Sequence, residues 1–573
     1  MLLNEILNHQ QRETINEALD ETLDPNFRGL LFNLPMGTGK TRIALVTVLN
    51  NMVANEQENP TLIIASKTLI IGWIAEIKKI DPEKKFFKYE ILHRDYLKSG
   101  YPQWRPHTST NLVLTTPQTA VTGYRSNEVE SEYIEIVEDG PRKVNYYKSP
   151  REPLVEATNI SRGADYLHTH QWSNLIIDES HNYSNINTRT SRALASLCAD
   201  HRWLLTGTPL PEPKAERVLG LLQLVGQFSP ESIPETVQML RSHDFEGLRQ
   251  ISIKIAPVPL PNIEVNRETI RYQASYNELR IYDFFKFVTE TWQEYYQLQR
   301  SFLGARDPHL AQIRGNLLSL LTYSRMALTT PTEALDRLLD KIKSASYLAG
   351  LHEEIEEMSV IVREITNQSS RILELQKLLD RHHDGSVLVF ANYQHSLQTA
   401  RDYLIEHYGD ATDGDGDVRS DRNFYLLTAN YSLSDRVKLI DEFNHDPTGV
   451  LFLSYQIGAE GLNLQHAQTV VLLDQYWNSH RQEQAFHRTY RQGGKHTHLN
   501  LYTVLSETRF EANLIGKHLE KSSLSDAILE GYDELEDSPY KTTSRFKTSF
   551  VEMLQRDGVD GDGDGDIEID VDN

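Results

Sequence analysis

The chain has 573 residues, of which 39% are hydrophobic and 24% are charged, and this predicts a globular protein of about three or four structural units. Its one cysteine, Cys198, excludes an internal disulfide and a zinc finger built on cysteine pairs, and indicates a reducing compartment. The net charge of −23 weakly disfavours a nucleic-acid partner, although a local basic lining is sufficient for a cleft that binds DNA.

The sequence disfavours membrane insertion and secretion. No window approaches the roughly 18 uninterrupted apolar residues that a membrane helix needs. The first nine residues carry an acid and amides where a signal peptide would carry basic charge. We therefore expect an intracellular protein that has no membrane partner.

Short apolar runs alternate with helical patterns in two stretches of the chain, which is typical of parallel sheets. The first stretch runs from about residue 29 to residue 224. Its expected strands are 29–34, 61–65, 112–116, 175–178 and 203–206. Within this stretch, residues 132–147 have the pattern of a hairpin that turns at Asp139-Gly140.

Residues 274–379 have the pattern of long helices, and the proline-containing segment 257–261 separates them from the first sheet. The second alternating stretch follows, from about residue 386 to residue 505. Its expected strands are 387–391, 424–427, 450–454, 469–474 and 500–504. From about Asp557 the chain is acidic and of low complexity, which predicts disorder.

The segment LPMGTGKT at residues 34–41 joins the first apolar run to a helix start. Its backbone amides can point inward around phosphates, and a helix N-terminus favours anions. Lys40 is expected to reach the β- and γ-phosphates, and the Thr41 hydroxyl to ligate magnesium. The residues expected to bind nucleotide here are Met36, Gly37, Thr38, Gly39, Lys40 and Thr41. Taken alone, the segment also fits a glycine-rich turn before a helix.

The apolar run at residues 175–177 ends in two adjacent carboxylates. Asp178 is placed to hold magnesium through water, and Glu179 to orient and deprotonate the attacking water. An acidic pair after a strand is common, so this pair alone identifies no site. In this order and spacing, the phosphate loop and the acidic pair together predict a site that binds a nucleotide and magnesium.

Several further motifs resemble those of the Swi/Snf-type ATPases of helicase superfamily two, and the resemblance covers about residues 7–524. In the first half these motifs are LNHQQ at 7–11, SK at 66–67 with GWIAE at 72–76, and TT at 115–116. The resemblance implies that Gln11 reads adenine. It also implies that the next two motifs grip one DNA strand, with contacts from Lys67, Thr115 and Thr116.

The segment LLTGTP at residues 204–209 resembles the family's third motif, which links ATP hydrolysis to DNA. This resemblance implies a coupling role for Thr206 and Thr208, together with His181. The segments LPNIE at 260–264 and ELRIY at 278–282 resemble the connector between the two motor lobes of the family.

The second half of the chain resembles the same family. The matching segments are SVLVFANY at 386–393, GAEGLNL at 458–464, DQYWN at 474–478 and QAFHRTYRQG at 484–493. The resemblance implies a nucleotide contact by Gly461. It implies DNA contacts by Asn392, Ser454, Gly458, Asn463 and Trp477.

Two arginines of the last segment, Arg488 and Arg491, would share one face of a helix at spacing i and i+3. A guanidinium carried by the second lobe can neutralise the γ-phosphate only when both lobes close on ATP. The alternative is a solvated basic helix face. With the other motifs present, we interpret the pair as arginine fingers that couple closure to hydrolysis.

The chain departs from the usual family pattern at Ser66, Ala429, Ser479 and Gly494. None of these positions carries an expected phosphate or magnesium contact, so they indicate a divergent branch of the family. The motor motifs begin within the first dozen residues, and no cysteine pairs are present for a RING finger. We therefore expect a compact, monomeric motor whose targeting partner is a protein supplied in trans.

The resemblance implies an α/β fold of two RecA-like parallel-sheet lobes with a helical insertion between them. The expected domains are 1–228 for the first ATP-binding lobe with a hairpin insertion at about 124–170, 229–380 for the connector and helical insertion, 381–525 for the second lobe, and 526–573 for a C-terminal brace and acidic tail.

The resulting hypothesis is a DNA-dependent ATPase that translocates on double-stranded DNA and remodels protein–DNA complexes, with ATP and magnesium as cofactors. It would work in the nucleus or another DNA-containing compartment, and a viral origin stays open. One alternative is a strand-separating helicase on DNA or RNA. Another is a DNA-binding scaffold that does not hydrolyse ATP. The biological target is open in every case.

Overall fold

The computed structural model contains two compact units, one within Met1–Leu260 and one within Pro261–Ala459 and Asn463–His518. It describes residues 3–35, 37–56, 58–94, 97, 104–124, 131–136, 142–147, 166–186, 188–211, 215–226, 251–254, 263–302, 308–343, 360, 369–409, 422–431, 433–458, 462, 464–476, 479–490, 496–508, 511 and 514–516. The acidic tail from Asp557 lies outside these residues. No helix among the described residues is long and apolar enough to cross a membrane.

The first unit is built on a seven-stranded sheet in the order β3-β4-β2-β7-β8-β1-β9, in which every pair is parallel. The strands are β1 (Gly29–Asn33), β2 (Thr61–Ile64), β3 (Tyr89–Leu92), β4 (Leu112–Thr115), β7 (Trp172–Asp178), β8 (Ala199–Thr206) and β9 (Ser252–Lys254). All five strands expected from the sequence are present, with small shifts at their ends. The strands β3 and β9 were not expected, since each lies at an edge of the sheet and is only partly buried, so it lacks a continuous apolar run.

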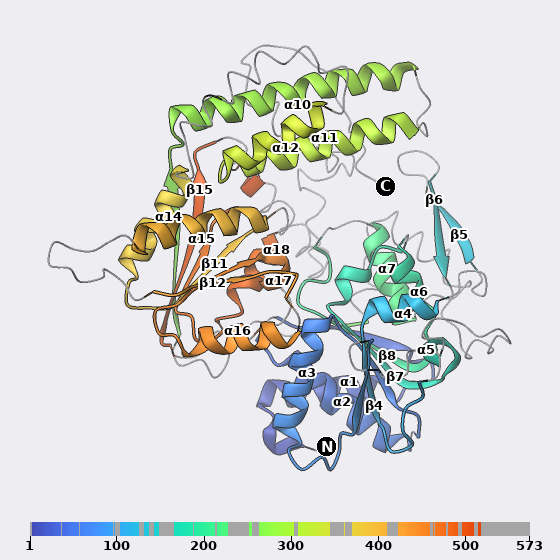
Figure 1. Cartoon of the computed structure of the whole chain (residues 1–573). Helices are drawn as coiled ribbons and strands as arrows, with labels where there is room; N and C mark the ends of the chain where they lie inside the picture. The colour runs from blue at the N-terminus through green and yellow to red at the C-terminus, as the bar shows by residue number, and fades with distance from the viewer. Residues whose placement is uncertain are drawn as a thin grey trace, which may run out of the picture. The chain divides into compact units, whose positions relative to one another are not determined.

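Helices cover both faces of this sheet (Figure 1). The helices α1 (His9–Glu21), α2 (Lys40–Ala54) and α3 (Lys67–Ile80) share one apolar core with side chains such as Phe32 and Ile176. The helices α4 (Pro117–Gly123), α5 (Tyr166–Thr169), α6 (Arg189–Ala195) and α7 (Ala215–Val225) share the opposite core, which contains Leu31 and Ile177. Neighbouring residues of one strand thus enter opposite cores, so the strands are continuous apolar runs.

A separate two-stranded antiparallel sheet lies within the first unit's part of the chain. Its strands are β5 (Ser131–Ile136) and β6 (Arg142–Tyr147), with Ser131 opposite Tyr147. The strands fall in the range where the sequence predicted a hairpin. The expected turn residues, Asp139 and Gly140, lie outside the described residues.

The second unit has a six-stranded sheet in the order β10-β15-β14-β11-β13-β12, again with only parallel pairs. The strands are β10 (Glu264–Tyr272), β11 (Val387–Ala391), β12 (Phe424–Leu427), β13 (Val450–Ser454), β14 (Thr469–Leu472) and β15 (His498–Ser506). The helices α14 (Ser370–Arg381) and α15 (Gln394–Gly409) pack against one face of it. The remaining helices of this sheet region are α16 (Leu433–His445), α17 (Tyr455–Gly458) and α18 (Ser479–Phe486).

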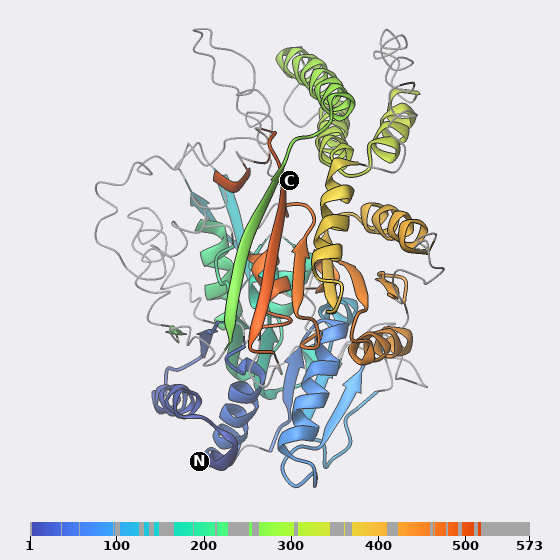
Figure 2. The same cartoon turned by 90° about the vertical axis from the view of Figure 1, so that its left-hand side faces the viewer.

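The strand β10 was not expected, because its segment EVNRETIRY is largely polar and was assigned to the connector. It forms one edge of the second sheet and pairs with β15 along its whole length, from Glu264 opposite His498 to Tyr272 opposite Ser506 (Figure 2). Most of its side chains are exposed or half-buried, which explains the missing apolar pattern.

Three long helices follow β10, in the stretch where the sequence predicted them. They are α10 (Tyr276–Phe302), α11 (Pro308–Ala327) and α12 (Pro331–Lys343). The first two run side by side (Figure 1), and all three enclose an apolar core of their own that includes Phe285, Trp292, Leu317 and Leu335. This core makes the helical insertion a packed element of the second unit.

Candidate ATP site and nucleic-acid interface

The loop between β1 and α2 has the backbone geometry of a phosphate cradle. Gly37 and Gly39 both have φ of 84°, in the left-handed region that glycine occupies without strain. Gly39 is the N-cap of α2, and no side chain caps the amides of the first turn among the described residues. These amides and the positive end of the helix dipole are therefore suited to an anion.

Gln11 contacts this loop directly. Its Nε2 donates to the carbonyl oxygen of Thr38 at 2.9 Å, and a Cβ added to Gly39 would lie 2.5 Å from the same nitrogen. Gln11 also forms a capping box with Asn8 at the start of α1. The Nζ of Lys40 donates to the carbonyl oxygen of Leu34 at 3.2 Å, across the base of the loop. The adenine contact of Gln11 stays a prediction.

Asp178 lies at the end of β7. In the sheet, β8 separates β7 from β1, the strand that leads into the phosphate loop. Its Oδ1 accepts a hydrogen bond from the amide of Glu179 at 2.9 Å, and its Oδ2 accepts one from Nε1 of Trp73 at 2.9 Å. Burial raises the pKa of Asp178 to about 6, and the neighbouring Glu179 acts in the same direction. The Trp73 hydrogen bond and the charge of Lys40 oppose this rise in pKa.

The three expected coupling residues lie together beside Glu179. His181 Nδ1 is 2.8 Å from Oγ1 of Thr206 and 3.5 Å from Oε2 of Glu179. Thr206 ends β8, and its Oγ1 also accepts a hydrogen bond from the amide of Thr208 at 3.0 Å. A continuous path therefore joins the acidic pair to the segment after β8, and its role in coupling stays a prediction.

These residues fit a nucleotide with magnesium. Each oxygen of the Asp178 carboxylate accepts a protein hydrogen bond and keeps a further lone pair, which suits contact with a hydrated cation. Thr41 is half-buried in the first turn of α2. Thr41 and Asp178 would hold the ion, which supplies charge neutralisation to the phosphates when bound.

The expected DNA contacts of the first unit follow β2 and β4, which are neighbours in the sheet. Lys67 is the first residue of α3, and Ser66 caps this helix by accepting from the amide of Leu69 at 3.4 Å. Ser66, where the chain departs from the family pattern, thus serves as the N-cap of α3. Thr115 and Thr116 are buried, so their DNA role stays a prediction.

The two threonine hydroxyls are engaged inside the protein. Thr115 Oγ1 donates to the carbonyl oxygen of Leu92 at 2.7 Å. Thr116 Oγ1 caps α4 by accepting from the amide of Thr119 at 3.3 Å.

In the second unit, Asn392 and Ser454 lie at the ends of the paired strands β11 and β13. The Asn392 amide nitrogen Nδ2 donates to Asp474 Oδ1 at 2.6 Å and to the carbonyl oxygen of Gln475 at 2.7 Å. Ser454 Oγ accepts from the amide of Ile457 at 3.4 Å. The structure brings these residues to one sheet edge, and their contact with DNA stays a prediction.

Arg488 differs from its expected local structure. The helix α18 ends at Phe486, so Arg488 lies in the turns that follow and not on the helix face proposed for it. It is only 3% exposed, and its Nε donates to the carbonyl oxygen of Gly458 at 2.8 Å. Its role as an arginine finger stays a prediction. Five other expected site residues lie outside the described residues, namely Met36, Gly461, Asn463, Trp477 and Arg491.

Gly458 lies against an aromatic ring. A Cβ added there would lie 2.3 Å from Cε1 of Phe390. We expect Gly458→Ala to lower the free energy of unfolding by about 1–3 kcal/mol, because the buried ring has to shift. Gly315→Ala in α11 is the control, since its added Cβ meets nothing within 4 Å and alanine favours helix. Equal denaturation midpoints for Gly458→Ala and the parent protein would contradict the close contact.

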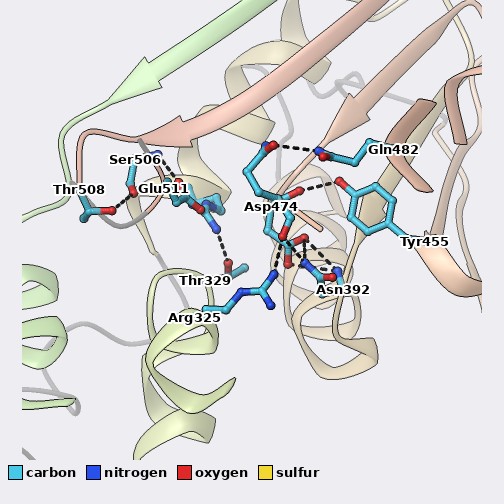
Figure 3. A network of polar contacts seen from close by, with 11 residues as sticks. Arg325, Thr329, Asn392, Tyr455, Asp474, Gln482, Ser506, Thr508 and Glu511 are labelled. Carbon is cyan, nitrogen blue, oxygen red and sulfur yellow. Dashed lines mark hydrogen bonds and ion pairs between the residues drawn. The ribbon is translucent and has the colours of Figure 1, made fainter. Parts of the chain in front are cut away.

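A buried polar network joins the helical insertion to the ends of β11, β14 and β15 (Figure 3). Arg371 is fully buried, and its Nη2 donates to Glu511 Oε1 at 2.5 Å. Glu511 Oε2 accepts from the amide of Ser506 at 2.7 Å, and Arg371 Nη1 donates to Thr329 Oγ1 at 3.2 Å. No sequence motif pointed to this ion pair, since its members are 140 residues apart.

The same network reaches the segment after β14. Arg325 of α11 donates from Nη2 to the carbonyl oxygen of Gln475 at 2.5 Å, and Gln482 of α18 donates to Oε1 of Gln475 at 2.9 Å. The hydroxyl of Tyr455 donates to the carbonyl oxygen of Asp474 at 2.6 Å. The helical insertion thus contacts the segment that follows β14, through the hydrogen bond from Arg325 to Gln475.

Burial raises the pKa of Asp474 to about 6, against the attraction of Arg371 and Arg325. Between about pH 4 and pH 6 the Asp474 carboxyl group therefore holds its proton more tightly in the folded state than in the unfolded state. The contribution of Asp474 to the free energy of unfolding thus falls as pH rises through this range. We compare the free energy of unfolding of Asp474→Asn with that of the parent protein. The difference should shift in favour of the variant by about 2–3 kcal/mol as pH rises from 4 to 7. Urea denaturation of both proteins across this range measures the change, and a pH-independent difference would contradict it.

Together the phosphate loop after β1, the acidic pair after β7 and the second parallel sheet define a P-loop nucleotide-binding protein with two α/β units. Comparison with known families agrees. The chain matches the SNF2-related domain over residues 10–246 and the helicase conserved C-terminal domain over residues 370–493. It therefore belongs to the SNF2 family of helicase-type ATPases, whose membership implies ATP hydrolysis.

Several curated relatives carry related names. The chain is 23% identical to "Putative helicase 172L" of Invertebrate iridescent virus 6, over 92% of this chain and 89% of that protein. It is 23% identical to chromodomain-helicase-DNA-binding protein 8 of Danio rerio and 22% identical to chromodomain-helicase-DNA-binding protein 7 of Homo sapiens. These matches cover 91% and 96% of this chain but only 19% and 17% of the longer relatives.

A solved structure is also similar along most of its length. The SWI2/SNF2 ATPase core of Sulfolobus solfataricus, in complex with dsDNA, is 16% identical over 92% of this chain and 93% of that one, with a TM-score of 0.32.

Proposed function

We propose that this protein is an ATPase that is stimulated by double-stranded DNA, translocates along the duplex without separating its strands, and remodels protein–DNA complexes. One observation carries the proposal. The ATP-site residues on β1, β7 and β8 and the expected DNA contacts after β2 and β4 lie at the carboxyl edge of one parallel sheet. Membership of the SNF2 family supports the same activity.

The residues have separate roles in this proposal. The amides of residues 37–40 and the ammonium group of Lys40 bind the phosphates, and Thr41 and Asp178 hold magnesium. Glu179 orients the attacking water and accepts its proton. Arg488 and Arg491 neutralise charge on the γ-phosphate when the two lobes close, so that hydrolysis depends on closure.

Double-stranded DNA would be bound mainly through its phosphates. The expected contacts are polar side chains and glycine backbone groups, which predicts weak sequence preference and strong dependence on salt. A protein partner supplied in trans would direct a monomeric motor to its target. The names of the chromodomain relatives, which include DNA binding, support DNA as the substrate.

The test is the steady-state ATPase rate with duplex DNA, single-stranded DNA, RNA or no nucleic acid, at one salt concentration. We expect duplex DNA to give the largest stimulation. Equal stimulation by RNA would overturn the assignment to DNA. Absence of turnover under every condition would favour the non-hydrolysing scaffold.

A further inference from the structure

Trp73 of α3 is a buried residue in contact with the proposed magnesium site. It is 1% exposed, although its segment resembles one that grips DNA. Its Nε1 donates to Asp178 Oδ2 at 2.9 Å, while the amide of Glu179 donates to Oδ1. The contact is possible because α3 follows β2, which is the sheet neighbour of β7. The Asp178 carboxylate is therefore oriented at both of its oxygens.

A second side chain ties α3 to α2, the helix that follows the phosphate loop. Glu76 lies three residues after Trp73, so it shares the same region of the helix surface. Its Oε1 accepts from Arg42 Nε at 2.7 Å and lies 2.6 Å from Arg42 Nη2. Arg42 is two residues after Lys40 in α2. The pair is 22% exposed on each side, so solvent screens it only in part.

The start of α3 is the part expected to meet DNA. Lys67 is its first residue, and Ser66 caps it. Lys67 and Trp73 lie within two turns of the same α-helix, so we expect a displacement of the start of α3 to reach Trp73. The helix α3 thus carries an expected DNA contact at its start. Farther along, it contacts the Asp178 carboxylate through Trp73 and the helix α2 through Glu76.

We propose that Trp73 is a positioning residue, which orients the Asp178 carboxylate for magnesium and ties that carboxylate through α3 to the helix end carrying Lys67. The inference rests on the ATP site of the proposed function and deepens it. Packing of an apolar core requires no N–H group, so burial alone does not account for a donor that points at a carboxylate. Only the indole N–H explains the contact with the carboxylate.

The test compares Trp73→Phe with Trp203→Phe. Trp203 is a matched control, because it is also fully buried in the first unit and donates from Nε1 to a side-chain oxygen, Asn174 Oδ1, at 2.9 Å. The probe is a fluorescent ATP analogue, titrated without DNA in Mg²⁺ and again in EDTA. Loss of an outer contact to a metal ligand weakens metal binding by about 10–100-fold.

We therefore expect Trp73→Phe to bind the analogue at least about tenfold more weakly in Mg²⁺ and unchanged in EDTA. Trp203→Phe should bind like the parent protein in both buffers. Three outcomes would overturn the proposal. Trp73→Phe could bind the analogue like the parent protein in Mg²⁺, it could lose as much affinity in EDTA as in Mg²⁺, or Trp203→Phe could lose as much affinity as Trp73→Phe.

A second titration tests the tie to the Lys67 end. If duplex DNA tightens analogue binding in the parent protein, the effect should persist in Trp203→Phe and shrink in Trp73→Phe. An undiminished effect in Trp73→Phe would overturn the coupling part of the inference. If duplex DNA does not change analogue binding in the parent protein, that result contradicts the DNA dependence of the proposed function. The Mg²⁺ titration still tests the positioning role of Trp73, because it contains no DNA.

Discussion

Replacing Glu179 with glutamine is expected to lower the ATP turnover number by about 10²- to 10⁴-fold, because a positioned general base contributes about this factor. The amide keeps the size of the side chain but cannot accept the proton of the attacking water. Glu179 lies at the end of β7, and its Oε2 is 3.5 Å from His181 Nδ1, so its position is defined by its neighbours. Affinity for ATP with Mg²⁺ should change little.

Steady-state turnover and equilibrium binding of an ATP analogue separate these two effects. Glu333→Gln, on α12 in the second unit, is the control for an equivalent change on a helix that carries no expected site residue. Unchanged turnover in Glu179→Gln would show that this carboxylate is not the base.

Replacing Arg371 with methionine is expected to lower the free energy of unfolding by about 3–5 kcal/mol, since it leaves the charge of Glu511 buried without its partner. Glu511 is 3% exposed and, among the described residues, would keep the hydrogen bonds from Ser506. The loss should appear in the unfolding of the second unit, where α14 and the end of β15 meet through this pair. Chemical denaturation followed by circular dichroism measures it.

The double variant Arg371→Met with Glu511→Leu should recover much of the loss, because both charges are then absent. The exposed pair of Arg337 and Glu333 is the comparison, and Arg337→Met should cost less than about 1 kcal/mol. A loss in Arg371→Met no larger than that in Arg337→Met would contradict the importance of the buried pair.

The sheet strands were largely predictable because strands buried on both faces are continuous apolar runs. Leu62–Ile64 and Val387–Phe390 are of this kind, and both are fully buried strands. The strand β10 carries largely polar residues at a sheet edge, so its pattern did not distinguish it from a connector. Its place in the sheet depends on the pairing with β15, more than two hundred residues later.

The phosphate loop and the acidic pair were recognisable because their chemistry depends on residue type and local spacing. The structure places His181, Thr206 and Thr208 together as a connected group. The contact of Trp73 with Asp178 could not be read from the sequence, where a tryptophan in an apolar helix indicates only burial. The close approach of Gly458 to Phe390 likewise depends on how α17 packs against β11.

Displacement from a single DNA substrate tests whether the protein moves along duplex DNA without separating its strands. The substrate carries a labelled third strand bound to an intact duplex and a second label on one duplex strand. With ATP and Mg²⁺ we expect release of the third strand while the duplex stays paired, and no release by Glu179→Gln. Release of the labelled duplex strand, or retention of the third strand during ATP hydrolysis, would contradict it.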